Sequence, residues 1–185
     1  MAEYYLISQL PSLDGISEAT PVPITEERFL DLCGRSLGEA AQKTLAKLTL
    51  APSRDLEEMA SPLLDAWMQG ERDLRLALAK VRAEKLSKPF DMANKSLPAE
   101  LLKVAATAVE LESPMEAEKF LSDYRLGFLE FLRPTDPFCE DFVYYYGLKL
   151  KLLLRSRQFD TRLGEAEYRN IYNSIMNGDR LEAIQ

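Results

Sequence analysis

The side chains in this sequence that could do chemistry are carboxylates, lysines, arginines and two cysteines, because it contains no histidine. Histidine is the commonest general base and metal ligand, and every Ser-His or Cys-His nucleophile requires it. Two acidic groups, Asp55-Glu57-Glu58 and Glu110-Glu112, are candidates for acid-base work. Carboxylates do such work only where burial or mutual repulsion separates their pKa values. Both groups stand in polar sequence at expected helix ends, so we interpret them as solvated surface.

The cysteines and glycines give no further sign of a reactive centre. Cys33 and Cys139 are isolated, with neither the spacing of metal ligands nor a disulfide framework, so we expect two reduced, buried thiols. The 8 glycines are scattered, and none of them forms a phosphate-binding loop. We therefore expect no catalytic residue, no metal and no cofactor, and a chain that is not an enzyme.

Cations gather in two regions of a chain whose formal net charge is −7. Residues 61–98 hold 7 basic and 5 acidic side chains, and residues 143–185 hold the same numbers. Two interpretations stay open. The cations form solvated faces, with an exposed Glu71–Arg75 pair worth a few tenths of a kcal/mol, or arginine forks meet carboxylates on a partner. The candidate partner-binding residues are Arg72, Arg75, Arg82, Lys149, Lys151 and Arg155.

Tyr144-Tyr145-Tyr146, followed by several cations, invites comparison with surfaces that stack nucleic-acid bases. Elsewhere the chain is acidic, with 10 acidic and 5 basic side chains in residues 1–60 and 10 and 4 in residues 99–142. Phosphates would be repelled by this excess. Tyrosines at the start of an apolar helix also bury their rings readily. We expect no nucleic-acid partner and favour a protein partner with charged patches.

Helices are expected to position all of these residues. In residues 61–86, the spacing of Leu63, Trp67, Leu74, Leu78 and Val81 predicts one apolar stripe on a long helix. Serine caps followed by first-turn prolines begin this helix at Ser61-Pro62 and another at Ser113-Pro114. Thr25 is a possible cap for a helix that follows it, and the Ser36-x-x-Glu39 pattern predicts a further cap at Ser36. Further helices are expected over 26–33, 36–48, 98–112, 138–157 and 163–176, with a short element at 54–60. Period-two alternation over 148–152 leaves a strand conceivable there.

These elements predict one all-α domain over residues 1–185, with about six or seven helices. An irregular lead-in over 1–24 is expected to hold a short apolar element, strand or helix, at Tyr4–Leu10. A helical body over 25–176 and a polar tail over 177–185 follow. The N-terminus has no signal pattern, and the longest apolar-rich run, 142–154, is too short to cross a bilayer. We expect a cytoplasmic protein without direct membrane insertion.

Three segments resemble an uncharacterised bacterial family that is encoded among the subunits of V-type ATPases. They are Tyr4–Pro11, with its aromatic and apolar start ending in Leu-Pro; Trp67–Leu86, and especially Leu74–Ala83, with Leu-Arg, Leu-Ala and Arg-Ala pairs; and Tyr146–Leu153, rich in Tyr, Lys and Leu. The family is similar in helical character to the socket subunit of V-type ATPases, which joins the rotating shaft to the membrane ring. This chain is much shorter than a full socket subunit.

The resemblance implies a noncatalytic component of a bacterial V/A-type ATPase that couples or supports the connection between central shaft and membrane ring. Its partners would be other V-type ATPase subunits, in the central stalk or the membrane ring. Such a protein would lie in the cytoplasm, peripheral to the inner membrane through the complex. The alternative is a freestanding helical adaptor or regulatory interaction module.

Overall fold

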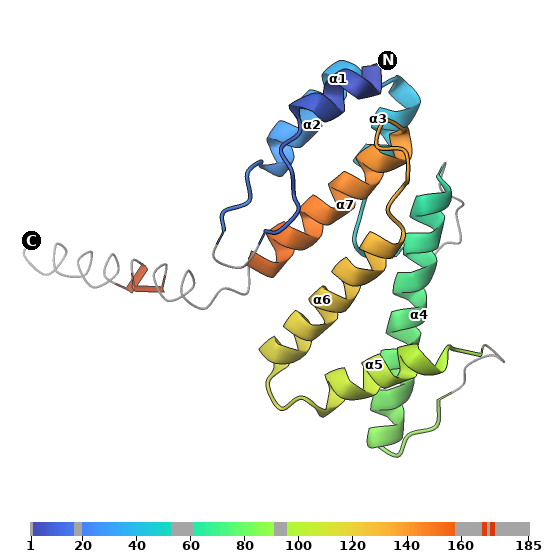
Figure 1. Ribbon diagram of the computed structural model, residues 1–185. Helices are drawn as coiled ribbons and strands as arrows, with labels where there is room; N and C mark the ends of the chain where they lie inside the picture. The colour runs from blue at the N-terminus through green and yellow to red at the C-terminus, as the bar shows by residue number, and fades with distance from the viewer. Residues whose placement is uncertain are drawn as a thin grey trace, which may run out of the picture.

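All regular structure of the described residues is helical, which confirms the all-α prediction (Figure 1). A computed structural model describes residues 2–16, 20–52, 61–90, 96–157, 168, 169, 171 and 172. Seven helices lie in these ranges. They are α1 (Ala2–Gln9), α2 (Glu26–Ser36), α3 (Glu39–Ala46), α4 (Pro62–Lys85), α5 (Ala99–Glu110), α6 (Pro114–Phe131) and α7 (Glu140–Arg157).

Side-chain caps begin three helices where the sequence predicts them. The hydroxyls of Thr25, Ser61 and Ser113 accept hydrogen bonds from the first-turn backbone N–H groups of α2, α4 and α6. A fourth predicted cap, Ser36, is wrong. Ser36 is the last residue of α2, and the N–H of Leu37 donates to Cys33 O at 2.9 Å, so Gly38 is the N-cap of α3. Helix α2 runs three residues past the predicted end at Cys33, which moves the boundary.

Of the strand and the helix considered for the short element at Tyr4–Leu10, the structure has the helix, α1. Its apolar side chains also enter the core: Leu6, Leu13 and Ile24 are all buried. Gly15 lies between them with a φ of +69°, a left-handed conformation that glycine adopts without strain. The irregular part is thus confined to the connection between α1 and α2.

Several sequence predictions lie outside the described residues. These are the element at 54–60 with the acidic group Asp55-Glu57-Glu58, most of the helix at 163–176, and the tail at 177–185. Tyr168, Arg169, Ile171 and Tyr172 are described and helical. Glu110 and Glu112 are exposed, as predicted.

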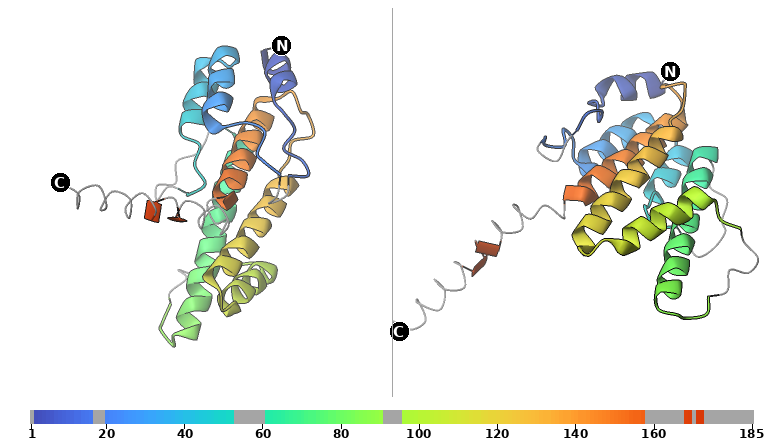
Figure 2. Two further views of the ribbon diagram at one scale, coloured as in Figure 1. Left: turned by 90° about the vertical axis from the view of Figure 1, so that its left-hand side faces the viewer. Right: turned by 60° about the horizontal axis from the view of Figure 1, so that its bottom comes forward.

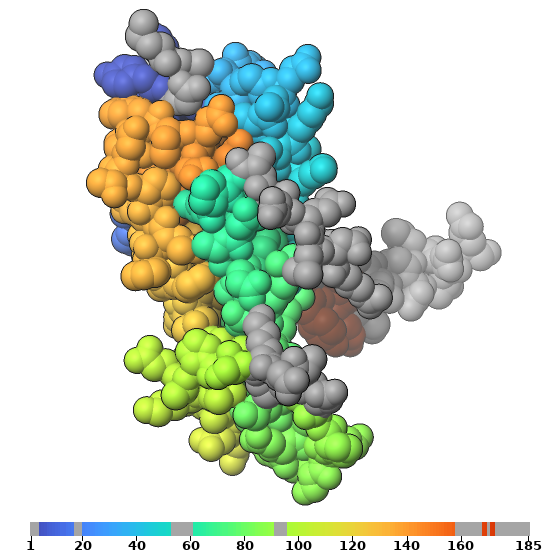
Figure 3. All heavy atoms as spheres, turned by 90° about the vertical axis from the view of Figure 1, so that its right-hand side faces the viewer, coloured from blue at the N-terminus to red at the C-terminus, as the bar shows by residue number. Residues whose placement is uncertain are grey.

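The apolar side chains form two separate clusters. The first joins the N-terminal part of α4 (Leu63, Trp67) with α1, α2, α3, α7 and the C-terminal end of α6 (Leu129). The second joins the C-terminal part of α4 (Leu74, Leu78) with α5 and the N-terminal half of α6. The apolar stripe predicted for α4 is therefore confirmed, but its two halves serve different clusters. In Figure 3, α4 runs down the molecule and ends beside α5.

Helix α7 is the centre of the first cluster, and it packs against α2, α3, α4 and α6 (Figures 1 and 2). All residues from Val143 to Leu150 are buried, so apolar side chains on every face of the helix find neighbours. The strand considered for 148–152 is excluded. Gly147 permits the close approach of α2 and the segment after α3, since an added Cβ would lie 2.8 Å from Leu48 Cδ2 and 3.2 Å from Phe29 Cε1.

A pair of glycines tests the packing between α4 and α6. A Cβ at Gly70 would lie 2.3 Å from the Phe128 ring, which stacks on Trp67, whereas a Cβ at Gly127 meets nothing within 4 Å. We expect Gly70→Ala to lower the free energy of unfolding by about 1–2 kcal/mol, because overpacking outweighs the gain in helix propensity. Gly127→Ala should raise it by up to about 1 kcal/mol. Urea unfolding measures both, and equal effects at the two positions would contradict the close contact.

Candidate functional site

The arginines of α4 lie at its exposed and half-exposed positions. Arg75 and Arg82 are exposed and seven residues apart, which places them on the same side of the helix. Arg72 is half-buried. Arg75 also forms an ion pair within α4, because its Nε lies 3.6 Å from Oε2 of Glu71. We call these three residues of α4 the arginine face.

Three of the four cations of α7 pair with acids of the same chain. Lys149 Nζ lies 2.6 Å from Asp14 Oδ1 and 2.6 Å from Glu130 Oε1, and Lys149 is buried. Lys151 pairs with Glu26 at the start of α2, and Arg155 Nη2 lies 2.5 Å from Glu118 Oε1 in α6. These contacts hold α7 to the lead-in, to α2 and to α6. The structure therefore divides the six candidate residues into an arginine face on α4 and a set of internal ion pairs.

A buried ion pair that the sequence did not suggest lies between the two apolar clusters. Arg125 Nε donates to Glu71 Oε1 at 2.7 Å, and the two side chains are 8% and 2% exposed. Glu71 follows the first-cluster residues of α4 and precedes those of the second, and Arg125 stands between Leu121 and Leu129 in α6. The expected Glu71–Arg75 pair is present at 3.6 Å, but it is not fully solvated, because Glu71 is buried and its shorter contact is with Arg125.

This pair belongs to a longer row of alternating charges. Arg125 Nη1 lies 3.6 Å from Glu118 Oε1, and the same oxygen contacts Arg155. The row therefore runs Arg75, Glu71, Arg125, Glu118, Arg155 and crosses from α4 through α6 to α7. Glu71 Oε2 and Arg125 Nη1 have no hydrogen bond within the described structure, so ionic attraction rather than saturated hydrogen bonding holds them. The outer members, Arg75 and Arg155, are 46% and 36% exposed.

The Lys149 cluster shows how strongly these contacts favour the charged forms. Burial lowers the pKa of Lys149, but hydrogen bonds to Asp14 and Glu130 outweigh it and raise the pKa above its ordinary value. The hydrogen bond from Lys149 lowers the pKa of Asp14. Burial raises the pKa of Glu130, yet its hydrogen bonds from Lys149 and Tyr145 bring it below the ordinary value. All three groups are charged in the neutral range, where the cluster is stabilising.

The three tyrosines are core residues, as the sequence predicts. Each is at most 5% exposed, and each hydroxyl reaches the boundary of the core. Tyr145 donates to Glu130 at 2.7 Å, and Tyr146 donates to Pro11 O at 2.8 Å. Burial raises the pKa of Tyr145 to about 12. The rings are thus unavailable for stacking on bases.

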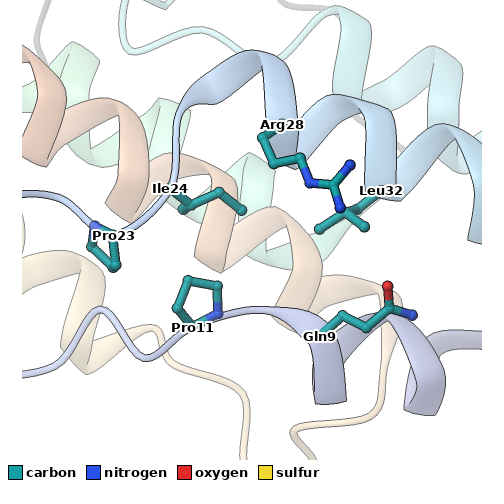
Figure 4. A pocket seen from close by; sticks show the side chains of 6 residues that line it. All are labelled: Gln9, Pro11, Pro23, Ile24, Arg28 and Leu32. Carbon is teal, nitrogen blue, oxygen red and sulfur yellow. The ribbon is translucent and has the colours of Figure 1, made fainter.

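The hollow shown in Figure 4 lies between the end of α1 and the start of α2. It has a volume of about 370 Å³. Its polar side chains already have partners, because Arg28 donates to Asp31 at 2.8 Å and the Gln9 amide donates to Tyr5 O at 3.2 Å. The remaining lining residues are Pro11, Pro23, Ile24 and Leu32. This hollow offers no pair of titratable groups that could act together.

The cysteine and acidic side chains form no metal centre in the described ranges, where no three Cys, Asp or Glu side chains come together as ligands. Cys33 is buried, and burial raises its pKa to about 12, while Cys139 is half-buried, which corrects the expectation of two buried thiols.

Among the helices described, none is long and apolar enough to cross a membrane. Comparisons of the chain with protein-family models, with curated proteins and with solved structures found no match.

The buried ion pair makes a quantitative prediction. Arg125→Met keeps the length of the side chain but leaves Glu71 charged, buried and without its closest partner, so we expect unfolding to become easier by about 3–5 kcal/mol. In Glu71→Met/Arg125→Met both charges are gone, and much of that loss should be recovered. Urea unfolding of the two single variants and the double variant gives the coupling. A double variant that loses the sum of the single effects would show that the two side chains do not interact.

The Lys149 cluster predicts a pH dependence. Since the carboxyl pKa values of Asp14 and Glu130 are lowered on folding, their contribution is complete above about pH 5 and is lost as the pH falls through the folded values. We expect Lys149→Met to cost about 1–2 kcal/mol near pH 7, reduced because both carboxylates are partly exposed, and clearly less near pH 3. Unfolding curves at both pH values test this. A cost independent of pH would assign the effect to packing alone.

Proposed function

We propose that this chain is a noncatalytic, cytoplasmic component of a bacterial V/A-type ATPase, similar to the socket subunit, that supports the connection between central shaft and membrane ring. The proposal starts from the three segments that resemble the ATPase-associated family. Two of them, Tyr4–Pro11 and Tyr146–Leu153, are in contact, since the Tyr146 hydroxyl donates to Pro11 O. Each resembling segment also contributes to the core, since Leu6, Leu74 and Leu148 are buried, and this suits a mechanical rather than a chemical role.

The single observation that carries the proposal is the arginine face on a well-supported helix. Helix α4 has 24 residues and is anchored by both apolar clusters and by the buried Glu71–Arg125 pair. The exposed guanidinia of Arg75 and Arg82 are therefore presented on a support that resists bending. Arginine forks bind carboxylates with defined geometry, which suits a lasting contact with an acidic protein.

This role also fits the treatment of the remaining charges. Three of the four cations of α7, namely Lys149, Lys151 and Arg155, are already paired with acids of the same chain. A surface for phosphates or anionic lipids would keep such cations exposed. The proposed partners are accordingly other ATPase subunits, in the central stalk or the membrane ring. The protein would be peripheral to the inner membrane only through that complex.

Affinity purification at native abundance tests the proposal. The tagged full chain should copurify with V-type ATPase subunits, identified by mass spectrometry. Arg75→Gln/Arg82→Glu should reduce their recovery most strongly at low salt and less near 0.3 M salt, because salt screens the charges that the variant removes. A neutral residue is used at position 75 because Glu71 lies 3.6 Å from Arg75, so a second carboxylate there would disturb the fold.

The matched control is Lys43→Glu/Lys47→Gln on and just after α3. It makes the same change in net charge at two exposed positions away from α4, so recovery should stay at the wild-type level. Both variants should unfold at the wild-type temperature. A wild-type chain that enriches no ATPase subunit would sink the proposal and leave a freestanding adaptor as the function. Equal losses in the two variants would remove the arginine face from it.

A further inference from the structure

Three aromatic rings meet on the surface at the N-terminal end of α1. The ring of Tyr4 lies 5.0 Å from that of Phe138 and 5.9 Å from that of Tyr5, measured between centroids. Tyr4, Tyr5 and Phe138 are 55%, 65% and 46% exposed. Figures 1 and 2 show this end of α1 beside the loop that leads into α7. We call the three rings and the neighbouring acids Asp136 and Glu140 the aromatic end.

The aromatic end is rich in carboxylates. The sequence has no Lys or Arg in residues 1–27 and none in residues 134–148, the two segments that form it. Asp136 and Glu140 flank Phe138 and are exposed. The nearest cation along the chain, Arg133, stands over the rings of Phe142 and Tyr145, at 5.8 and 5.7 Å from their centroids. The exposed rings therefore lie beside acids whose own segments supply no Lys or Arg to neutralise them.

This combination differs from scattered surface apolar residues, which need no explanation. Two segments more than a hundred residues apart bring their rings into contact without burying them. Tyrosine and phenylalanine rings with a polar rim are the usual anchors of protein interfaces. Helix α7 also begins here with Glu140 and Asp141 in its first turn, and their two charges exceed the partial positive charge of the helix N-terminus. The charged side chains that residues 1–27 and 134–148 supply here are all acidic.

We propose that the aromatic end is a docking surface for a basic amphipathic helix of a partner protein. Apolar side chains of that helix would pack on Tyr4 and Phe138. Its arginines or lysines would lie over the exposed ring faces, where a cation and a ring attract each other. They would also pair with Glu140 and Asp136. Partner specificity follows from requiring both an apolar stripe and flanking cations.

Charge excludes the other occupants of an exposed aromatic surface. Nucleic acids and anionic membranes would meet carboxylates instead of cations. A second copy bound through the same surface would place acids opposite acids, because a two-fold contact repeats the same patch on both copies. This surface is also separate from the arginine face, since α1 and the C-terminal part of α4 lie at opposite ends of the molecule (Figures 1 and 2). The aromatic end is therefore independent of the ATPase assignment.

Binding of a designed peptide to the full chain tests the inference. The probe is a labelled helical peptide of about 18 residues with leucines on one face and arginines on the other; the comparison peptide carries glutamates instead of arginines. We expect the arginine peptide alone to bind. Tyr4→Ser/Phe138→Ser should weaken it at least about tenfold, whereas Phe131→Ser should not, since Phe131 is 84% exposed but lies in no ring pair within the described residues.

Further variants keep the test independent of folding. Tyr4→Phe retains the ring and should bind as the wild type does. Glu140→Gln retains the shape and should weaken binding several-fold at low salt, with less effect near 0.5 M salt. Circular dichroism and melting temperature establish that each variant is folded. Equal binding of both peptides, or no loss with Tyr4→Ser/Phe138→Ser in a folded protein, would overturn the proposal. The proposal would also be overturned if the wild-type protein dimerised, or bound phosphatidylserine vesicles, and Tyr4→Ser/Phe138→Ser abolished that behaviour.

Discussion

The arrangement of the two apolar clusters depends on the buried ion pair between Glu71 and Arg125. Each residue stands on a helix at the point where that helix leaves one cluster and enters the other. Sliding α4 by one turn against α6 would move the charges apart by about 5.4 Å and leave both of them buried without a partner. Apolar side chains alone tolerate such shifts far better. The pair thus fixes the register between the two helices and separates the clusters.

Internal pairing also explains why charge is distributed unevenly along the sequence. The acids that contact Lys149, Lys151 and Arg155 are Asp14, Glu26, Glu118 and Glu130. All four come from the two acidic segments, 1–60 and 99–142, whereas the three cations come from a basic one. Folding brings segments of opposite charge together around α7. The basic region 143–185 of this acidic chain is therefore explained in part by ion pairs within the chain.

The sequence reveals helix caps more readily than contacts between helices. Caps at Thr25, Ser61 and Ser113 were predictable because a cap depends on residues within one turn. Ser36 misled because the preceding helix decided the boundary. The burial of Arg125 depends on another helix, so composition could not reveal it. Its spacing from Leu121 and Leu129 does carry a signal, because an arginine on an otherwise apolar stripe requires a buried acid. Lys149, inside the most apolar stretch of the chain, carried the same signal.

Because many cations are paired within the chain, the two ends of the molecule differ in the charge that they expose. With Lys149, Lys151, Arg155 and Arg125 paired inside, the arginine face remains as the exposed basic surface of α4, and the aromatic end remains acidic. Helix α4 alone spans about 36 Å over its 24 residues. Its register against α6 is fixed, and α7 is tied by ion pairs to three other parts of the chain. A shift of α4 against α6 would separate the buried Glu71 from Arg125 and is therefore costly. Opposite surface chemistry at the two ends would suit the proposed connection between two different proteins.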